Sequence, residues 1–223
     1  MEILKKIWKI FKKNFKVEKA KTIEKIAIFG FADADPKSKL YKDAYQVSKT
    51  LAESGYTIVE GGGPGVMLAA SKGAKAGHGK VIGVTLNPVD LTNFEGRNEE
   101  NIVDEEIKTT TYIERTLTLM QQGQVYVIFN GGTGTISEFA MAWGLARLYF
   151  GHHKPLILYG NFWRKVMKTL DDGFLLRPEE KEVYKIADNP KEVLKAIKEF
   201  ECEIDSDKIK ECKISGEDGY SFS

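Results

Sequence analysis

At 223 residues the chain is long enough for one domain with a well-buried core, and its length does not require a second domain. The formal net charge of +1 argues against a general nucleic-acid binder, and no apolar run approaches the roughly 18 residues that cross a membrane. Two cysteines, Cys202 and Cys212, do not make a disulfide framework, so a cytoplasmic protein is expected.

Residues 1–22 predict a basic amphipathic helix. Lysines fill the polar face, and the apolar residues that recur at helical spacing are Ile3, Leu4, Ile7, Trp8, Phe11 and Phe15. We favour the interpretation that this helix packs on its own domain or on a second subunit. Contact with an anionic membrane surface is the alternative.

From residue 23 the chain alternates between short apolar runs and amphipathic segments. Strands are expected at 24–30, 56–60, 80–86, 124–130, 154–160 and 182–188, and helices at 38–55, 66–77, 109–123, 134–150, 161–173 and 189–200. Residues 87–101 lack periodicity and predict a loop. This order is typical of a parallel sheet covered on both faces. We predict a single doubly wound, Rossmann-like α/β domain over residues 23–201, followed by a polar tail at 202–223.

Two glycine-rich turns follow predicted strands, at Glu60 to Met67 and at Gly131 to Glu138. Glycines let the backbone approach a ligand closely, and the N-terminus of the following helix offers N–H groups to an anion. In a doubly wound sheet, ligands bind at the carboxyl ends of the strands. Thr133 and Thr135 add hydroxyl groups to the second turn. The two turns together therefore favour phosphate binding.

Other familiar motifs are missing from the sequence. The first strand runs into "GFADAD" rather than the dinucleotide fingerprint, and "GHGKV" is not a P-loop. His152 and His153 are adjacent without evident further ligands, so a turn is favoured over a metal site. Ser137 lacks the context of an esterase nucleophile.

Glu138 is the most informative residue of the second turn. An acid is favourable at a helix N-terminus for dipole reasons alone, yet it would repel a phosphate bound beside it. A phosphorylated sugar resolves this conflict, because the turn would hold the phosphate while Glu138 faces the sugar carbon. A carboxylate can stabilise the oxocarbenium-like state of glycosidic cleavage and orient a water. Arg115 is the candidate cation that positions the carboxylate or the ligand, although a surface arginine paired with Glu114 or another acid is the simpler alternative.

At these residues the sequence resembles the Rossmann-like LOG proteins, which are cytokinin riboside 5′-monophosphate phosphoribohydrolases. The resemblance runs from about Lys25 to Phe200. Three motifs carry it in order, and they are "GGGPGVM", "ERTLTLM" and "GGTGTISE". The third motif is the most specific of the three.

The resemblance implies hydrolysis of an AMP-like or cytokinin-like nucleoside 5′-monophosphate to free base and ribose 5-phosphate, without a metal or organic cofactor. It implies that Arg115 and Glu138 are catalytic. The residues expected to bind substrate or phosphate are Gly61, Gly62, Gly63, Gly65, Met67, Gly131, Gly132, Thr133, Gly134 and Thr135. A homodimer or larger homo-oligomer is also implied. The near-neutral charge predicts no specific nucleic-acid partner.

The sequence departs from the family motifs at several positions. Thr116 replaces a lysine, Tyr112 and Ile113 replace Met-His, Asn130 replaces a proline, and Ser137 replaces the first of two acids. These departures leave the base preference open. The alternative function is a non-catalytic nucleotide sensor or a carrier of a nucleotide-like cofactor such as the molybdenum cofactor. A single-strand DNA-processing protein is disfavoured by the neutral charge.

Overall fold

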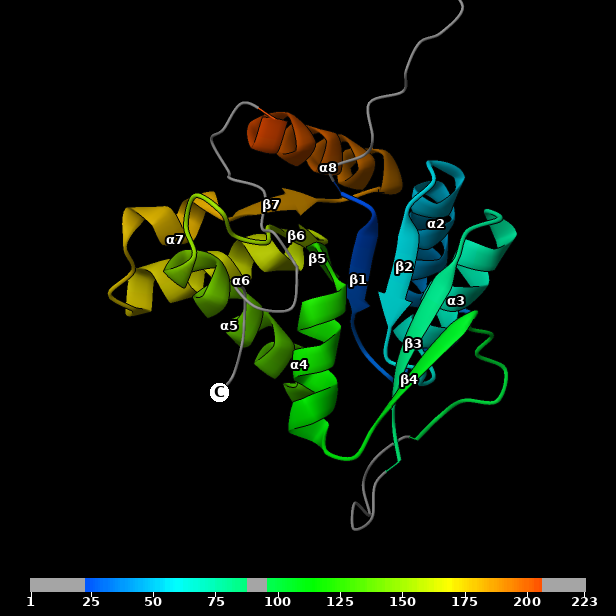
Figure 1. Cartoon of the computed structure of the whole chain (residues 1–223). Helices are drawn as coiled ribbons and strands as arrows, with labels where there is room; N and C mark the ends of the chain where they lie inside the picture. The colour runs from blue at the N-terminus through cyan, green and yellow to red at the C-terminus, as the bar shows by residue number, and fades with distance from the viewer. Residues whose placement is uncertain (1–22, 88–95, 206–223) are drawn as a thin grey trace, which may run out of the picture.

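The computed structural model describes residues 23–87 and 96–205 (Figure 1). The amphipathic helix predicted at 1–22 lies outside these residues, as does the chain beyond residue 205. The last helix, α8, spans Pro190–Asp205, so the first residues of the segment expected as a tail are helical.

Within the described residues, seven strands form one parallel sheet. The strands are β1 (Lys25–Phe29), β2 (Thr57–Glu60), β3 (Val81–Leu86), β4 (Glu105–Thr109), β5 (Val125–Ile128), β6 (Leu156–Tyr159) and β7 (Tyr184–Ala187). Their order in the sheet is β4-β3-β2-β1-β5-β6-β7, and every neighbouring pair is parallel. The predicted doubly wound, Rossmann-like α/β fold is therefore confirmed.

Helices cover both faces of the sheet (Figure 1). One face carries α2 (Lys39–Glu53), α3 (Val66–Ala76) and α8, and the other carries α4 (Tyr112–Gln122), α5 (Thr133–Leu148) and α6 (Phe162–Gly173). A short helix, α7 (Pro178–Glu182), packs on α5, where Trp143 Nε1 donates to Glu180 O over 2.7 Å.

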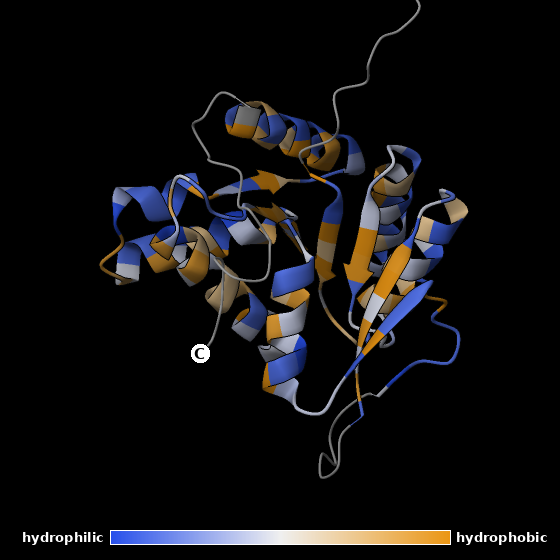
Figure 2. Ribbon diagram, viewed as in Figure 1, coloured by the Kyte–Doolittle hydropathy of each residue, from blue (hydrophilic) through white to orange (hydrophobic). Residues whose placement is uncertain are grey.

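The central strands are buried on both sides, and successive residues point to opposite faces. In β1, Ile26 and Ile28 join the core beneath α2 and α3, whereas Ala27 and Phe29 join the core beneath α4 and α5. Figure 2 shows the resulting apolar centre of the sheet and the mixed, two-sided colouring of the surrounding helices. This double burial explains why the central strands appear in the sequence as continuous apolar runs.

Two elements escaped the sequence prediction. Strand β4 has the sequence EEIKT at the edge of the sheet, where four of its five residues are exposed or half-buried, so it has no apolar pattern. Helix α7 is too short to show a helical period. Across the residues that the structure describes, every helix falls short of the length or the apolar character needed to cross a bilayer.

Candidate active site at the carboxyl edge of the sheet

The two glycine turns flank the exit of the central strand. The chain adds β2 to β4 on one side of β1 and then β5 to β7 on the other, so the topological switch lies at β1. The first turn follows β2 and leads into α3, and the second follows β5 and leads into α5. Since the sheet is parallel, both turns lie at the carboxyl edge, where ligands of such folds bind.

The segment after β1 connects the two turns. Phe31 donates its backbone N–H to Asn130 O over 3.1 Å, and Val66 donates its N–H to Phe31 O over 3.0 Å. A Cβ atom on Gly30 would lie 2.7 Å from Val66 Cγ1 and 3.0 Å from Phe129 Cβ, so this close approach requires glycine. This segment carries no glycine-rich motif, so nothing in its sequence indicated a place at the site.

The second turn presents an open helix N-terminus. Gly132 is the N-cap of α5, and no side chain caps the helix. The first N–H groups of a helix have no partner within it, so they are available to an anion. Gly132 and Thr133 are exposed, whereas Thr135 is buried beneath Gly131. These positions agree with phosphate binding, although the assignment of individual residues stays a prediction.

The first turn uses its polar groups within the protein. Gly62 has a positive φ of 73° and donates its N–H to Glu60 Oε2 over 2.7 Å, while its carbonyl accepts from Asn98 N over 2.9 Å. Asn101 Nδ2 donates to Gly63 O over 3.0 Å. The turn is thereby fixed against residues 98–101. Phosphate binding by the first turn stays a prediction. The structure does not support it at Gly62, because the N–H and the carbonyl of this residue both bond within the protein.

Arg115 is almost fully buried, with 5% of its surface exposed. Its Nε donates to Val84 O over 3.0 Å, and its Nη2 donates to Gly61 O over 2.8 Å and lies 3.3 Å from Met67 Sδ. A Cβ atom on Gly61 would overlap the guanidinium, so the first turn is shaped around Arg115. The alternative of a surface arginine paired with Glu114 is therefore wrong, since Glu114 instead accepts from the Thr110 N–H and hydroxyl.

Glu138 is also buried, with 8% of its surface exposed. Burial raises the pKa of its carboxyl from the ordinary 4.5 to about 7, and the positive charge of Arg115 opposes this rise. The structure thus buries the two residues predicted to be catalytic, and the charge of Arg115 acts on the carboxyl of Glu138. A carboxyl with a pKa near 7 can hold or release a proton at neutral pH.

A second buried acid, Glu60, was not singled out from the sequence as a charged group of the site. It is fully buried at the end of β2, where Oε2 accepts from Gly62 N and from Asn101 Nδ2. Burial raises its pKa to about 7, against the effect of these bonds and of the charges of Arg115 and Arg97. Among the described residues, Glu60 Oε1 and Asn101 Oδ1 have no hydrogen-bond partner. Glu60 could have been identified from the sequence, because it is an acidic residue at the end of an apolar strand and directly precedes three glycines.

Tyr112 and Ser137, two residues at which the sequence departs from the family motifs, lie side by side at the second turn. Tyr112, the first residue of α4, places its hydroxyl 3.3 Å from Ser137 Oγ on α5. Ser137 also donates to Gly134 O over 2.7 Å. The helices that carry Arg115 and Glu138 are therefore joined beside the second turn.

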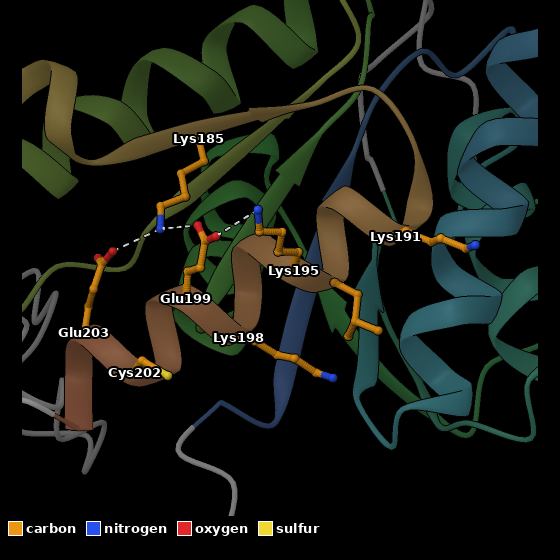
Figure 3. Close-up of a pocket in the computed structure, with 8 residues that line it drawn as sticks. Lys185, Lys191, Lys195, Lys198, Glu199, Cys202 and Glu203 are labelled. Atoms are coloured by element: carbon orange, nitrogen blue, oxygen red, sulfur yellow. Dashed lines mark hydrogen bonds and ion pairs between the residues drawn. The ribbon is translucent and has the colours of Figure 1, made fainter.

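A separate pocket of about 630 Å³ lies on β7 and α8 (Figure 3). Its charged lining residues are Lys185, Lys191, Lys195, Lys198, Glu199 and Glu203. Lys185 Nζ donates to Glu199 and Glu203 over 2.9 and 3.0 Å (Figure 3). These two bonds neutralise part of the positive charge of the pocket. None of the residues predicted for the site lines this pocket, and we place the candidate site at the glycine turns.

A family model and two named proteins match most of the chain. Residues 23–173 match the model of the SLOG cluster4 family. Over 166 residues the chain is 31% identical to a cytokinin riboside 5′-monophosphate phosphoribohydrolase of Mycobacterium tuberculosis, an alignment that covers 71% of this chain and 86% of the relative. A protein of the same name from Arabidopsis thaliana is 26% identical over 192 residues, covering 82% of this chain and 84% of the relative.

Solved structures with the same fold include proteins of other functions. The molybdenum cofactor binding protein of Rippkaea orientalis is 25% identical with a TM-score of 0.60, covering 80% of this chain and 97% of that one. The Moco carrier protein of Chlamydomonas reinhardtii is 26% identical with a TM-score of 0.57, covering 81% and 99%. DNA processing protein A of Helicobacter pylori, at 17% identity and a TM-score of 0.51, shares the fold alone over 82% of this chain and 85% of that one.

Proposed function

The chain belongs to the SLOG cluster4 family, and from that premise we propose that it hydrolyses the N-glycosidic bond of a nucleoside 5′-monophosphate. The family match and the relatives named phosphoribohydrolases confirm the predicted resemblance to the LOG proteins. The observation that carries the proposal is the buried pair of Arg115 and Glu138 next to an uncapped helix N-terminus.

In the proposed reaction the phosphate binds the N–H groups at the start of α5, which holds the ribose over Glu138. A water molecule attacks C1′ of the ribose while the bond from C1′ to the base nitrogen breaks. The attacking water releases a proton as its oxygen bonds to C1′. The base leaves with the electron pair of the broken bond and takes up one proton, so that one water yields free base and ribose 5-phosphate. The ionised Glu138 carboxylate stabilises the oxocarbenium-like carbon and orients the water.

Arg115 has the role of a positioning cation in this proposal. Its guanidinium is bonded inward to Val84 O and Gly61 O, so its orientation is fixed before a ligand binds. The positive charge favours the ionised form of Glu138, which is the form that the reaction requires. Without it, burial alone would keep a larger fraction of Glu138 protonated at neutral pH.

The test is to incubate the full chain with a panel of nucleoside 5′-monophosphates and measure free base and ribose 5-phosphate. We expect release of both in equal amounts from at least one nucleotide. Glu138→Gln is expected to lower kcat by about 10²-fold or more, with nucleotide binding nearly unchanged, because the amide cannot replace the charge. The matched control is Glu182→Gln, which changes an exposed acid on α7. Full activity in Glu138→Gln would contradict this mechanism.

A second candidate is a protein that binds a nucleotide or a nucleotide-like cofactor without turnover. The likeness to the two molybdenum cofactor proteins supports it, at 25% and 26% identity. A carrier has no need of the buried Arg115 and Glu138 pair, which is why we prefer the hydrolase. Tight nucleotide binding without base release from any member of the panel would favour this second candidate.

A further inference from the structure

Tyr112 is held in a fixed position beside the second glycine turn. It begins α4 directly after the N-cap Thr111, whose hydroxyl accepts from Glu114 N over 3.1 Å. The Glu114 carboxylate in turn accepts from the Thr110 N–H and hydroxyl over 2.7 and 2.8 Å. This capping fixes the backbone at the start of the helix and with it the direction of the Tyr112 Cα–Cβ bond.

The Tyr112 hydroxyl lies on the turn itself. It is 3.3 Å from Ser137 Oγ, and a Cβ atom on Gly134 would also lie 3.3 Å from it. A serine hydroxyl has one proton, and Ser137 donates it to Gly134 O over 2.7 Å. The proton between the two hydroxyls therefore belongs to Tyr112. A separation of 3.3 Å is long for an O–H···O bond, so this bond is weak and easily exchanged for a better acceptor.

The surroundings of this hydroxyl are open to a ligand. Tyr112 is half-buried, and the neighbouring Gly132, Thr133 and Ser137 are exposed. An anion at the start of α5 would meet the backbone N–H groups of that helix on one side and the Tyr112 hydroxyl, from α4, on the other. A phosphate oxygen is a stronger acceptor than Ser137 Oγ because it carries charge.

We propose that Tyr112 donates its phenolic proton to the phosphate of the bound ligand and so acts as a further binding and specificity residue. The inference rests on the proposed function, because that function places the phosphate at the start of α5. Tyr112 thus adds a side-chain donor to the backbone N–H groups of α5 and favours phosphorylated ligands over the corresponding nucleosides.

The experiment measures binding by calorimetry with the full chain, using AMP, ribose 5-phosphate and adenosine as probes. Tyr112→Phe removes only the hydroxyl. We expect this variant to bind AMP and ribose 5-phosphate more weakly than the parent, by the same factor of about ten or more for both. This factor corresponds to the loss of one hydrogen bond to a charged group. Adenosine should bind as weakly to the variant as to the parent. Tyr184→Phe, on the edge strand β7, is the matched control and should leave all three affinities unchanged.

Ser137→Ala separates ligand binding from a structural brace between α4 and α5. If Tyr112 contacts the phosphate, Ser137→Ala keeps the affinity of the parent for both phosphorylated probes. Equal losses in Ser137→Ala and Tyr112→Phe would show that the two hydroxyls only hold the helices together, and would overturn the proposal. Unchanged affinity in Tyr112→Phe would overturn it as well.

The binding data and the base-release assay distinguish this inference from the proposed function. Base release combined with unchanged binding in Tyr112→Phe refutes the inference alone. Weakened phosphate binding in Tyr112→Phe without any base release by the parent refutes the hydrolase alone. If neither phosphorylated probe binds the parent protein, the inference is wrong, and if no nucleotide of the panel releases base either, both proposals are wrong.

Discussion

Glu138 is expected to reduce the stability of the folded protein at the pH where it is ionised. The residue is 8% exposed, and burial raises the pKa of its carboxyl from 4.5 to about 7 despite the charge of Arg115. The folded state therefore binds a proton more tightly than the unfolded chain does. Replacing Glu138 by Gln removes the ionisable group while nearly preserving the shape of the side chain.

The size of the effect follows from the two pKa values. One pKa unit corresponds to about 1.4 kcal/mol, so a carboxyl moved from 4.5 to about 7 destabilises the folded protein by about 3 kcal/mol once it is ionised in both states. Below pH 4.5 the group is protonated in both states and has no such effect. Stability is lost as the pH rises from 4.5 through 7, because the unfolded chain releases its proton first.

Urea unfolding followed by tryptophan fluorescence tests this reasoning at pH 5 and pH 8. We expect Glu138→Gln to exceed the parent by about 3 kcal/mol in free energy of unfolding at pH 8, and by less than about 1 kcal/mol at pH 5. Glu182→Gln, at an exposed position, should match the parent at both pH values. A Glu138→Gln variant no more stable than the parent at pH 8 would show that the carboxyl is well solvated or fully compensated by Arg115.

Further variants test the second turn and the support of α4. Gly131→Ala is expected to destabilise the protein by about 2 kcal/mol and to weaken phosphate binding, because the new Cβ would overlap Thr135. Gly132→Ala, with no atom within 4 Å of the new Cβ, should cost under about 1 kcal/mol in the same urea and calorimetry experiments. Lys154→Met should lower the unfolding free energy by about 2 kcal/mol, since it removes the buried ammonium that donates to the last carbonyls of α4 over 2.7 and 3.0 Å. Lys168→Met, at a largely exposed lysine, is its control, and equal effects in the two would contradict this role.

Most of the fold was predictable because its central strands are buried on both faces. Strand β5, for example, is fully buried, so its sequence contains only apolar residues and tyrosine. A glycine turn and a helix separate it from the next strand. Ser38 and Gly55 bound α2 as capping chemistry predicts, with Ser38 Oγ accepting from Tyr41 N. The edge strand β4 could not be found this way, since three exposed residues leave it without a hydrophobic period.

The site was only partly predictable because its contacts join residues far apart in the chain. The second turn with Glu138 is a local motif, and the sequence placed it correctly at a strand-to-helix junction. The partners of Arg115 lie 31 and 54 residues away, on β3 and in the first turn. The bond between Glu60 and Asn101 spans 41 residues. No local pattern encodes such pairs.

The sequence by itself determined the layered α/β architecture, the two glycine turns and the identity of the acid and the arginine, since each is written in periodicity or in a short motif. Only the tertiary structure determined how deeply these residues are buried and which groups surround them. It buried Glu138 and Arg115 together, directed the polar groups of the first turn inward, and brought the Tyr112 hydroxyl to Ser137. The physical reason is that desolvation and charge coupling depend on which atoms exclude water around a group, and those atoms come from strands and helices that the chain assembles only when it folds.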